Sequence, residues 1–245
     1  MKAVILAGGV GTRAKPFTDY FPKAMIPIEG KPLIDHVINY VSSFDFIDEI
    51  VILGDFKGLG YQIKNYFENR VRIGKKRLRF VQDSSSGTGG DLIHLKNILK
   101  RSSDFLLWFS DNLSPIDLTD MYKFYKEKKG IACIATRKYR KEETGYAVTR
   151  DGWIVEFKEK PIINLQMSEC LGIYMLGAKI LKLINSKRKK RKQINLSFDI
   201  LQELSNRKMI SAFDIGKTPW IDIDSPTKIE RNQELVKKIV KKMRG

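Results

Sequence analysis

The residues best suited to chemistry lie in the first 23 positions, in the stretch VILAGGVGTRAKPFTDYFPK. After an apolar run, Gly9, Gly11 and Ala14 have the G-x-G-x-x-A spacing of a loop that binds a dinucleotide. The same glycines also suit a loop around a nucleoside triphosphate, because they leave backbone N–H groups open to phosphate oxygens. Arg13 and Lys23 add positive charge to either kind of site.

Two prolines distinguish between these sites. A dinucleotide loop continues directly into a helix and is followed, near the end of the next strand, by an acidic residue for the ribose. Pro16 and Pro22 interrupt a helix here, because proline lacks an N–H donor and restricts the residue before it. The acid at the expected distance, Asp35, falls inside a predicted helix. The sequence therefore predicts an irregular loop that holds a triphosphate or pyrophosphate.

The remainder of the first half must build a sheet that presents this loop. Strand-like and helix-like segments alternate from residue 2 to about residue 137, with apolar residues at periods of 2 and 3.6 respectively. This alternation predicts an α/β fold with a Rossmann-like, mixed but mostly parallel sheet flanked by helices. One of the predicted helices is the segment GDLIHLKNILK. Ligands of such sheets bind beyond the carboxyl ends of the strands.

The second half of the chain carries a hairpin signal instead of a crossover. Two short strand-like runs flank Asp151 and Gly152, a pair typical of tight turns. We therefore predict a single domain over residues 1–245, with a smaller β-rich subregion inserted at residues 138–215. The strand-like stretch PWIDIDSP and a final helix complete the chain.

Composition narrows the class of protein. A hydrophobic content of 42% is ordinary for a globular domain, and no leader or long apolar span is evident, so we expect a soluble, cytoplasmic protein without a membrane segment. Cys133 and Cys170 lie in apolar surroundings and are expected to be buried free thiols. His36 and His94 are too few for a zinc site or a histidine-based triad.

The net charge of +17 indicates an anionic partner. Much of the excess lies in residues 187–192, KRKKRK, and in the C-terminal KKIVKKMR. The first run lacks interleaved aromatic residues, so we interpret it as a solvated loop, and the second as the outer face of an amphipathic helix. Nucleic acid is therefore not the expected partner, and salt-sensitive retention of RNA without catalysis would favour that alternative.

Further residues extend the pattern of the first loop. The chain contains Leu6-Ala7-Gly8-Gly9, Gly11-Thr12-Arg13, Pro16, Thr18, Pro22-Lys23, Pro27-Ile28 and Gly30-Lys31-Pro32. This set resembles the signature L-A-G-G-x-G-T-R-L-x-P-x-T, P-K and P-[IV]-x-G-K-P of the sugar-1-phosphate nucleotidylyltransferases, with Ala14 in place of the usual leucine. The resemblance covers nearly the whole chain. It implies a GT-A-like nucleotidyltransferase fold and an enzyme that joins a nucleoside triphosphate to a sugar 1-phosphate and releases pyrophosphate.

The resemblance also implies roles for individual residues. The implied nucleotide-binding set is Leu6, Ala7, Gly8, Gly9, Gly11, Thr12, Arg13, Gln82, Gly87 and Thr88. The implied sugar-binding set is Gly145, Glu159, Lys160 and Gly172, and the implied catalytic cations are Arg13, Lys23 and Lys160. Asp111 and Asp222 would bind Mg²⁺. The chain departs from the family pattern at Ser110, Cys170, Leu171 and Asp224.

The substrates are less closely defined than the reaction. The amide of Gln82 offers a donor and an acceptor, which suits uracil or thymine, so we favour UTP or dTTP with glucose 1-phosphate. A mannose-1-phosphate guanylyltransferase and an inositol-phosphate cytidylyltransferase stay open, the latter because of Asp224. A non-catalytic regulatory relative is the alternative of another class, although such chains usually lose the Arg, Lys or Asp positions kept here. A homo-oligomer is also left open.

Overall fold

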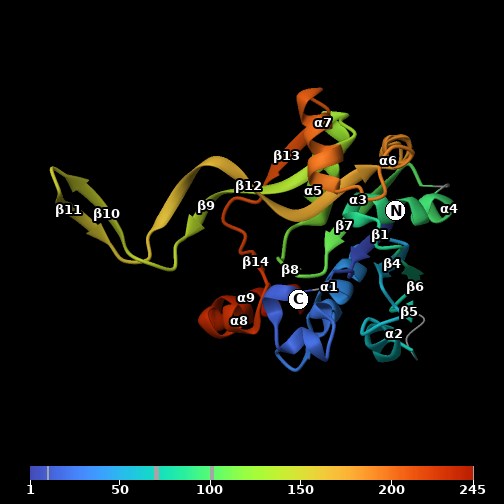
Figure 1. Ribbon diagram of the computed structural model, residues 1–245, viewed down its shortest axis with the longest axis horizontal. Helices are drawn as coiled ribbons and strands as arrows, with labels where there is room; N and C mark the ends of the chain where they lie inside the picture. The colour runs from blue at the N-terminus through green and yellow to red at the C-terminus, as the bar shows by residue number, and fades with distance from the viewer. Residues whose placement is uncertain (10, 69–71, 100–101, 245) are drawn as a thin grey trace.

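A computed structural model describes residues 1–9, 11–68, 72–99 and 102–244, and an eight-stranded sheet forms its centre (Figure 1). The strands, in spatial order, are β13 (Ile210–Asp214), β9 (Ala132–Lys141), β12 (Ile162–Gly177), β7 (Asp104–Phe109), β1 (Lys2–Leu6), β4 (Glu49–Gly54), β6 (Lys76–Gln82) and β5 (Arg72–Ile73). The four strands β7, β1, β4 and β6 are parallel, whereas β12 runs antiparallel to both of its neighbours. The predicted mixed, mostly parallel sheet is therefore confirmed.

Helices cover both faces of the sheet. One face packs against α1 (Leu33–Ser42), α2 (Tyr61–Tyr66), α5 (Leu118–Lys128), α8 (Pro226–Arg231) and α9 (Gln233–Arg244). The other face packs against α4 (Lys96–Leu99), α6 (Ile180–Arg188), the π-helix Leu196–Leu201 and α7 (Gln202–Asn206). In β1 the side chains of Ala3 and Ile5 enter the first core and those of Val4 and Leu6 enter the second. This strict alternation explains why the strand is apolar along its whole length.

The segment GDLIHLKNILK, residues 90–100, is helical over its described part, residues 90–99, and Lys100 lies outside the described residues. The helical stretch begins earlier than expected, with α3 (Gly87–Gly90), and continues as the 3-10 helix Asp91–Leu95 and α4. The N–H groups of Gly89 and Gly90 donate to the carbonyl of Ile194 at 2.9 and 3.1 Å, so the first turn is tied to a distant segment of the chain. Apolar periodicity does not predict these two hydrogen bonds, because they join residues about a hundred positions apart.

A long arm projects from the body of the molecule. Strands β9 and β12 continue beyond the helices and lead into the hairpin of β10 (Tyr146–Arg150) and β11 (Trp153–Lys158), which turns at Asp151 and Gly152 as predicted (Figure 1). Of the expected subregion 138–215, β12 and β13 belong to the main sheet, and the hairpin lies outside it.

The expectation of two buried thiols is wrong for one of them. Cys133 is buried, but Cys170 is exposed. The first part of β12, up to Cys170, is mostly exposed, whereas the residues from Leu171 onward are mostly buried between the helical layers. No helix in the described parts of the chain has the length and apolar character needed to cross a membrane.

Trp108 offers a test of the central packing. Its ring is fully buried in β7, and its indole N–H donates to the carbonyl of Asn112 at 2.9 Å. We expect Trp108→Phe to lower the free energy of unfolding by about 1–3 kcal/mol, because a buried carbonyl loses its donor. Urea denaturation measures this change. The matched variant Trp153→Phe, at a position 77% exposed in the hairpin, should be neutral. Equal losses in the two variants would contradict this account.

Candidate functional site

The loop that follows β1 stays irregular, as predicted. Three single-turn 3-10 helices, Thr12–Ala14, Phe17–Asp19 and Lys23–Met25, and the small hairpin of β2 (Pro27–Ile28) and β3 (Lys31–Pro32) occupy the chain before α1. Gly11 has φ 61°, and a Cβ atom built on it would lie 2.8 Å from Cγ2 of Thr18. The Thr18 hydroxyl donates to the Gly11 carbonyl at 2.9 Å, so a residue without a side chain is needed for the loop to close.

Lys23 and Asp111 meet at the carboxyl edge of the sheet. Nζ of Lys23 lies 2.6 Å from Oδ2 of Asp111, whose other oxygen accepts from the side-chain amide of Asn112 at 2.8 Å. The two side chains are 18% and 31% exposed. A cation from the β1 loop and an anion from the end of β7 are therefore paired, and both can still be reached by a ligand.

A second, two-stranded sheet positions Asp222 near Asp111. Strand β8 (Asn112–Leu113) pairs antiparallel with β14 (Ile221–Asp222), which aligns Asp222 with Asn112. The N–H of Ile223 donates to the Asp111 carbonyl at 2.7 Å. The two predicted magnesium carboxylates thus come from adjacent paired segments. This donor set fits Mg²⁺, which takes one or two protein carboxylates and completes its shell with phosphate oxygens and water.

Two contacts near these carboxylates were not predicted. Nζ of Lys228, on α8, contacts Oδ1 of Asp222. Nη1 of Arg13 lies 3.2 Å from Oδ2 of Asp224, and Oδ1 of Asp224 accepts from the hydroxyl of Ser225 at 3.1 Å. Asp224 is a departure from the family pattern, and its position two residues after Asp222 was the only signal in the sequence.

The predicted nucleobase segment begins at the carboxyl end of β6. Oε1 of Gln82 accepts from the N–H of Phe56 at 2.9 Å, and Nε2 donates to Oδ1 of Asp55 at 2.9 Å. This hydrogen bond from Gln82 is the main cause that holds the pKa of Asp55 below its ordinary value. The loops after β4 and β6 are therefore joined through the amide that was predicted to read the base.

The segment around Ile194, distant in the sequence, contacts the rest of this stretch. Gly87 has φ 87°, and a Cβ atom on it would lie 2.6 Å from the carbonyl oxygen of Ile194. The Thr88 hydroxyl accepts from the N–H of Leu196 at 3.0 Å. The backbone at Gly87 can approach Ile194 this closely only because glycine carries no side chain.

Comparison with known proteins identifies the family of the chain. A family model described as nucleotidyl transferase matches residues 2–238. The chain belongs to this family. A UTP–glucose-1-phosphate uridylyltransferase of Synechocystis sp. is 31% identical over 249 residues, which cover 89% of this chain and 61% of that protein. A glucose-1-phosphate cytidylyltransferase of Salmonella typhimurium is 31% identical over 207 residues, covering 76% of this chain and 79% of that protein.

A solved structure supports the fold. The inositol-1-phosphate CTP transferase from T. maritima superposes with a TM-score of 0.68 at 21% identity, covering 97% of this chain and 95% of that chain. The expected nucleotidyltransferase fold of GT-A-like type is thereby confirmed. The chain spans less than two thirds of the length of the Synechocystis relative.

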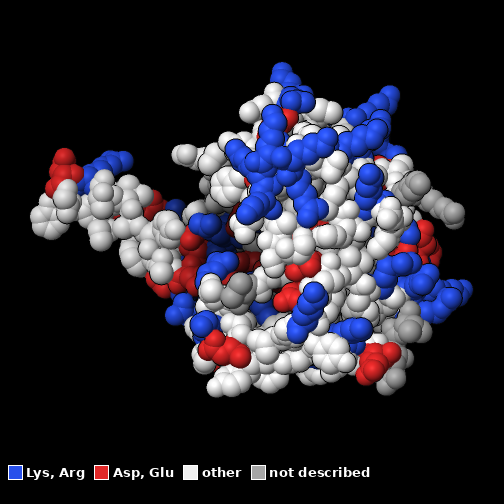
Figure 2. Space-filling view, turned by 45° about the vertical axis from the view of Figure 1, so that its right-hand side comes forward, with Lys and Arg blue, Asp and Glu red and all other residues white. Residues whose placement is uncertain are grey.

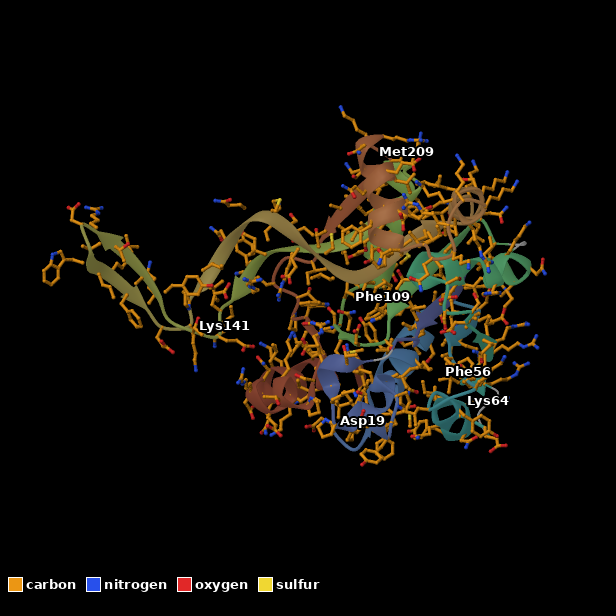
Figure 3. All side chains as sticks on the ribbon, viewed as in Figure 1. Asp19, Phe56, Lys64, Phe109, Lys141 and Met209 are labelled. Carbon is orange, nitrogen blue, oxygen red and sulfur yellow. The ribbon has the colours of Figure 1, made fainter. Side chains whose placement is uncertain are left out.

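The predicted sugar-binding residues fall into two groups. Gly172, in β12, lies against the side chain of Asn112 and so next to the carboxylates. Gly145 and Glu159 lie together at the base of the hairpin, where the N–H of Lys160 donates to the Thr144 carbonyl at 3.2 Å. Figure 3 shows Lys141, the last residue of β9, out along the arm and well away from Phe109 at the end of β7.

The hairpin base is joined to the body beside the site. Glu143 forms an ion pair with Arg231 of α8 at 3.9 Å and accepts from the side-chain amide of Asn232 at 3.4 Å. The same helix carries Lys228, the partner of Asp222. Within the described residues, no hydrogen bond or ion pair joins Glu159 or Lys160 to Lys23, Asp111 or Asp222. The tertiary contacts therefore bring the hairpin base next to α8 and not into the pair of Lys23 and Asp111.

Asp83 is a further acidic residue of the site that was not predicted. Its Oδ2 lies 2.7 Å from the position that a Cβ atom on Gly8 would take, so this carboxylate packs against the glycine loop. Burial, and then the charge of Asp91, raise the pKa of Asp83 above its ordinary value. The loop that is expected to hold phosphates is thus bordered by a carboxylate that is costly to ionise.

The raised pKa of Asp83 predicts a dependence of stability on pH. The folded chain binds this proton more tightly than the unfolded chain, so the contribution of Asp83 to stability falls as pH rises through the folded-state pKa. In Asp83→Asn the side chain is an amide, which does not ionise, so this contribution to the pH dependence is lost. We expect the free energy of unfolding of the variant, relative to the original chain, to increase between pH 4 and pH 7. Urea denaturation at several pH values measures it, and Asp45→Asn, at an exposed position, is the control that should show no such trend.

Proposed function

We propose that this chain transfers a uridylyl or thymidylyl group from UTP or dTTP to glucose 1-phosphate and releases pyrophosphate. The observation that carries the proposal is the contact of Lys23 with Asp111 at 2.6 Å, with Asp222 on the paired segment beside it. Two phosphate groups repel each other, so their reaction needs convergent cations and carboxylates able to bind a metal. Family membership supports the same class of reaction.

The proposed step is a displacement at phosphorus. An oxygen of the sugar phosphate attacks the α-phosphorus and forms a new P–O bond, while the bond to the bridging oxygen breaks and pyrophosphate leaves with the electron pair. Arg13, whose side chain is 75% exposed, would contact the leaving pyrophosphate. Lys23 would exchange Asp111 for phosphate oxygens and hold the two reacting groups together. Lys160 and Glu159 would reach the sugar phosphate from the hairpin base.

Asp111 and Asp222 would hold the Mg²⁺ ion. When bound, the ion supplies positive charge that neutralises the reacting phosphates and polarises the α-phosphate. Lys228 would then release Asp222 and face the phosphate side of the site. This part of the proposal rests on the paired segments that bring the two carboxylates together.

The choice of base rests on Gln82 and on one relative. The amide of Gln82 can donate and accept at once, which matches the O4 and N3–H of uracil. To bind the base it would release Phe56 and Asp55, both on the loop after β4. The name of the Synechocystis relative supports UTP and glucose 1-phosphate as the substrates.

A cytidylyltransferase is the second candidate. Nε2 of Gln82 donates to the carboxylate of Asp55 at 2.9 Å and to the backbone carbonyl of Asp83 at 3.2 Å. A carboxylate such as that of Asp55 accepts well from the N4 amino group of cytosine. The name of the Salmonella relative supports CTP with glucose 1-phosphate. The sugar would be the same in both candidates.

A substrate grid tests the proposal. Pyrophosphate release should be measured with Mg²⁺ for five nucleotides (ATP, GTP, CTP, UTP and dTTP) against glucose 1-phosphate, mannose 1-phosphate and inositol phosphate. We expect turnover with UTP or dTTP and glucose 1-phosphate, and a loss of about 100-fold in Arg13→Ala and in Asp111→Asn. Arg150→Ala, in the exposed hairpin, and Asp45→Asn are the matched controls and should keep full activity.

Other outcomes of the grid are equally informative. Turnover confined to CTP would replace the first candidate with the second. A blank grid from protein that is folded by circular dichroism would contradict catalysis and favour a non-catalytic relative.

The contact of Asp224 with Arg13 gives a separate prediction. We expect Asp224→Asn to lower kcat about two- to fivefold, because a partly exposed ion pair contributes at most about 1 kcal/mol to holding the guanidinium. In the Arg13→Ala background the same change should have no effect, since its partner is absent. Steady-state kinetics of the four proteins measures this coupling. An equal loss in both backgrounds would mean that Asp224 acts on something other than Arg13.

A further inference from the structure

The basic run, residues 187–192, forms a charged surface that the proposed reaction does not use. Figure 2 shows Lys and Arg side chains gathered over the upper part of the face on which α6 lies. Lys187 pairs with Glu203 at 2.6 Å and Arg191 pairs with Asp199 at 2.5 Å. The other four cations have no carboxylate within 4 Å in the described parts of the chain; they are Arg188, Lys189, Lys190 and Lys192. Their positive charge is therefore uncompensated.

These side chains line a hollow, which we call the basic hollow. Residues 188–193 form one wall and residues 84–86 form the other, and the hollow, which is open to solvent, has a volume of about 640 Å³. This volume lies in the range of sites for small molecules. Hydrogen bonds to Asp91 hold the wall of residues 84–86 in place. Oδ1 of Asp91 accepts from the N–H groups of Ser84 and Ser86 at 2.9 and 3.1 Å.

The basic hollow is coupled to the predicted nucleobase segment. The N–H of Ile194 donates to the carbonyl of Ser86 at 2.8 Å, and the carbonyl of Ile194 accepts from Gly89 and Gly90. Ile194 follows the basic run after a single residue, Gln193. A ligand that orders the basic run would therefore also order the backbone on both sides of Gly87.

The lining of the hollow identifies the chemistry of its ligand. Aromatic side chains, on which the bases of single-stranded nucleic acid stack, are missing from the residues that line it. Large apolar residues that would anchor a membrane surface are missing there too. Four uncompensated cations around a concave surface match the three to four negative charges of a triphosphate chain.

We propose that the basic hollow binds the phosphate chain of a soluble polyphosphate, as a second site apart from the glycine loop, and that this binding orders the segment from Ser86 to Gly90. The ligand class comprises inorganic tripolyphosphate and the triphosphate part of a nucleotide. This inference goes beyond the proposed function, since it does not require that the chain be active. It replaces the interpretation of the basic run as a merely solvated loop.

Titration calorimetry with inorganic tripolyphosphate tests the proposal. The background is the full chain with Arg13→Ala and Lys23→Ala, which removes the cations of the glycine loop. In that background, the hollow variant carries Arg188→Gln, Lys189→Gln, Lys190→Gln and Lys192→Gln. The control carries Lys237→Gln, Lys238→Gln, Lys241→Gln and Lys242→Gln, which remove the same charge from the exposed face of α9. We expect affinity to fall about tenfold or more in the hollow variant and to stay unchanged in the control.

Hydrogen exchange supplies a second readout. Tripolyphosphate, and UTP as a nucleotide source of the same chain, should slow exchange in residues 84–90 of the background protein, and should not do so in the hollow variant. Equal loss of affinity in the hollow variant and the α9 control would overturn the proposal, because it would indicate a general effect of net charge. Absence of binding in the background, or tighter binding of a single-stranded RNA than of tripolyphosphate at the hollow, would also overturn it.

The outcomes separate this inference from the proposed function. A chain that is active in the substrate grid but does not bind tripolyphosphate at the hollow contradicts only the second site. A chain that binds at the hollow but is inactive in the grid contradicts only the proposed reaction.

Discussion

The parallel pairing of β1 with β7 sets the positions of the groups in the site. Leu6 lies opposite Phe109 at the ends of these strands, and the N–H of Ser110 donates to the Leu6 carbonyl at 3.0 Å. The glycine loop and the turn that carries Asp111 therefore leave the sheet at the same level and on the same edge. Lys23 can reach Asp111 only because both loops begin from this common point. The β8–β14 ladder then brings Asp222 to the same place.

Charge is balanced in pairs throughout this region. Asp111, Asp222 and Asp224 contact Lys23, Lys228 and Arg13 respectively, and each partner comes from another part of the chain or another turn. Such partly exposed pairs contribute little to stability, commonly below about 1 kcal/mol. Their cations can therefore be transferred to phosphate oxygens at low cost. A site built this way is prepared for a highly charged ligand without leaving buried charges unpaired.

The two ends of the predicted nucleobase segment are held by different means. Gln82 is joined to the loop after β4, whereas residues 86–90 are joined to Ile194 in the segment after the basic run. The first connection joins the loops that follow the parallel strands β4 and β6. The second reaches the segment after residues 188–192, four of whose cations have no carboxylate partner in the described parts of the chain. The glycine at position 87 lets these two parts approach, because any side chain there would meet the carbonyl of Ile194.

The sequence by itself determined the irregular loop after β1, the alternation of strands and helices, and the turn at Asp151 and Gly152. These features depend on local chemistry, namely where proline excludes a helix and where apolar residues repeat. Through resemblance to a family, it also indicated that Lys23 would be a catalytic cation and Asp111 a magnesium ligand of the same site. Only the tertiary structure decided that Asp224 contacts Arg13, that Gly89 and Gly90 donate to the carbonyl of Ile194, and that Cys170 is exposed. The first two features depend on contacts between residues far apart in the chain, and the exposure of Cys170 depends on where the helical layers end. Long-range contacts and the edges of layers leave no periodic pattern in the sequence.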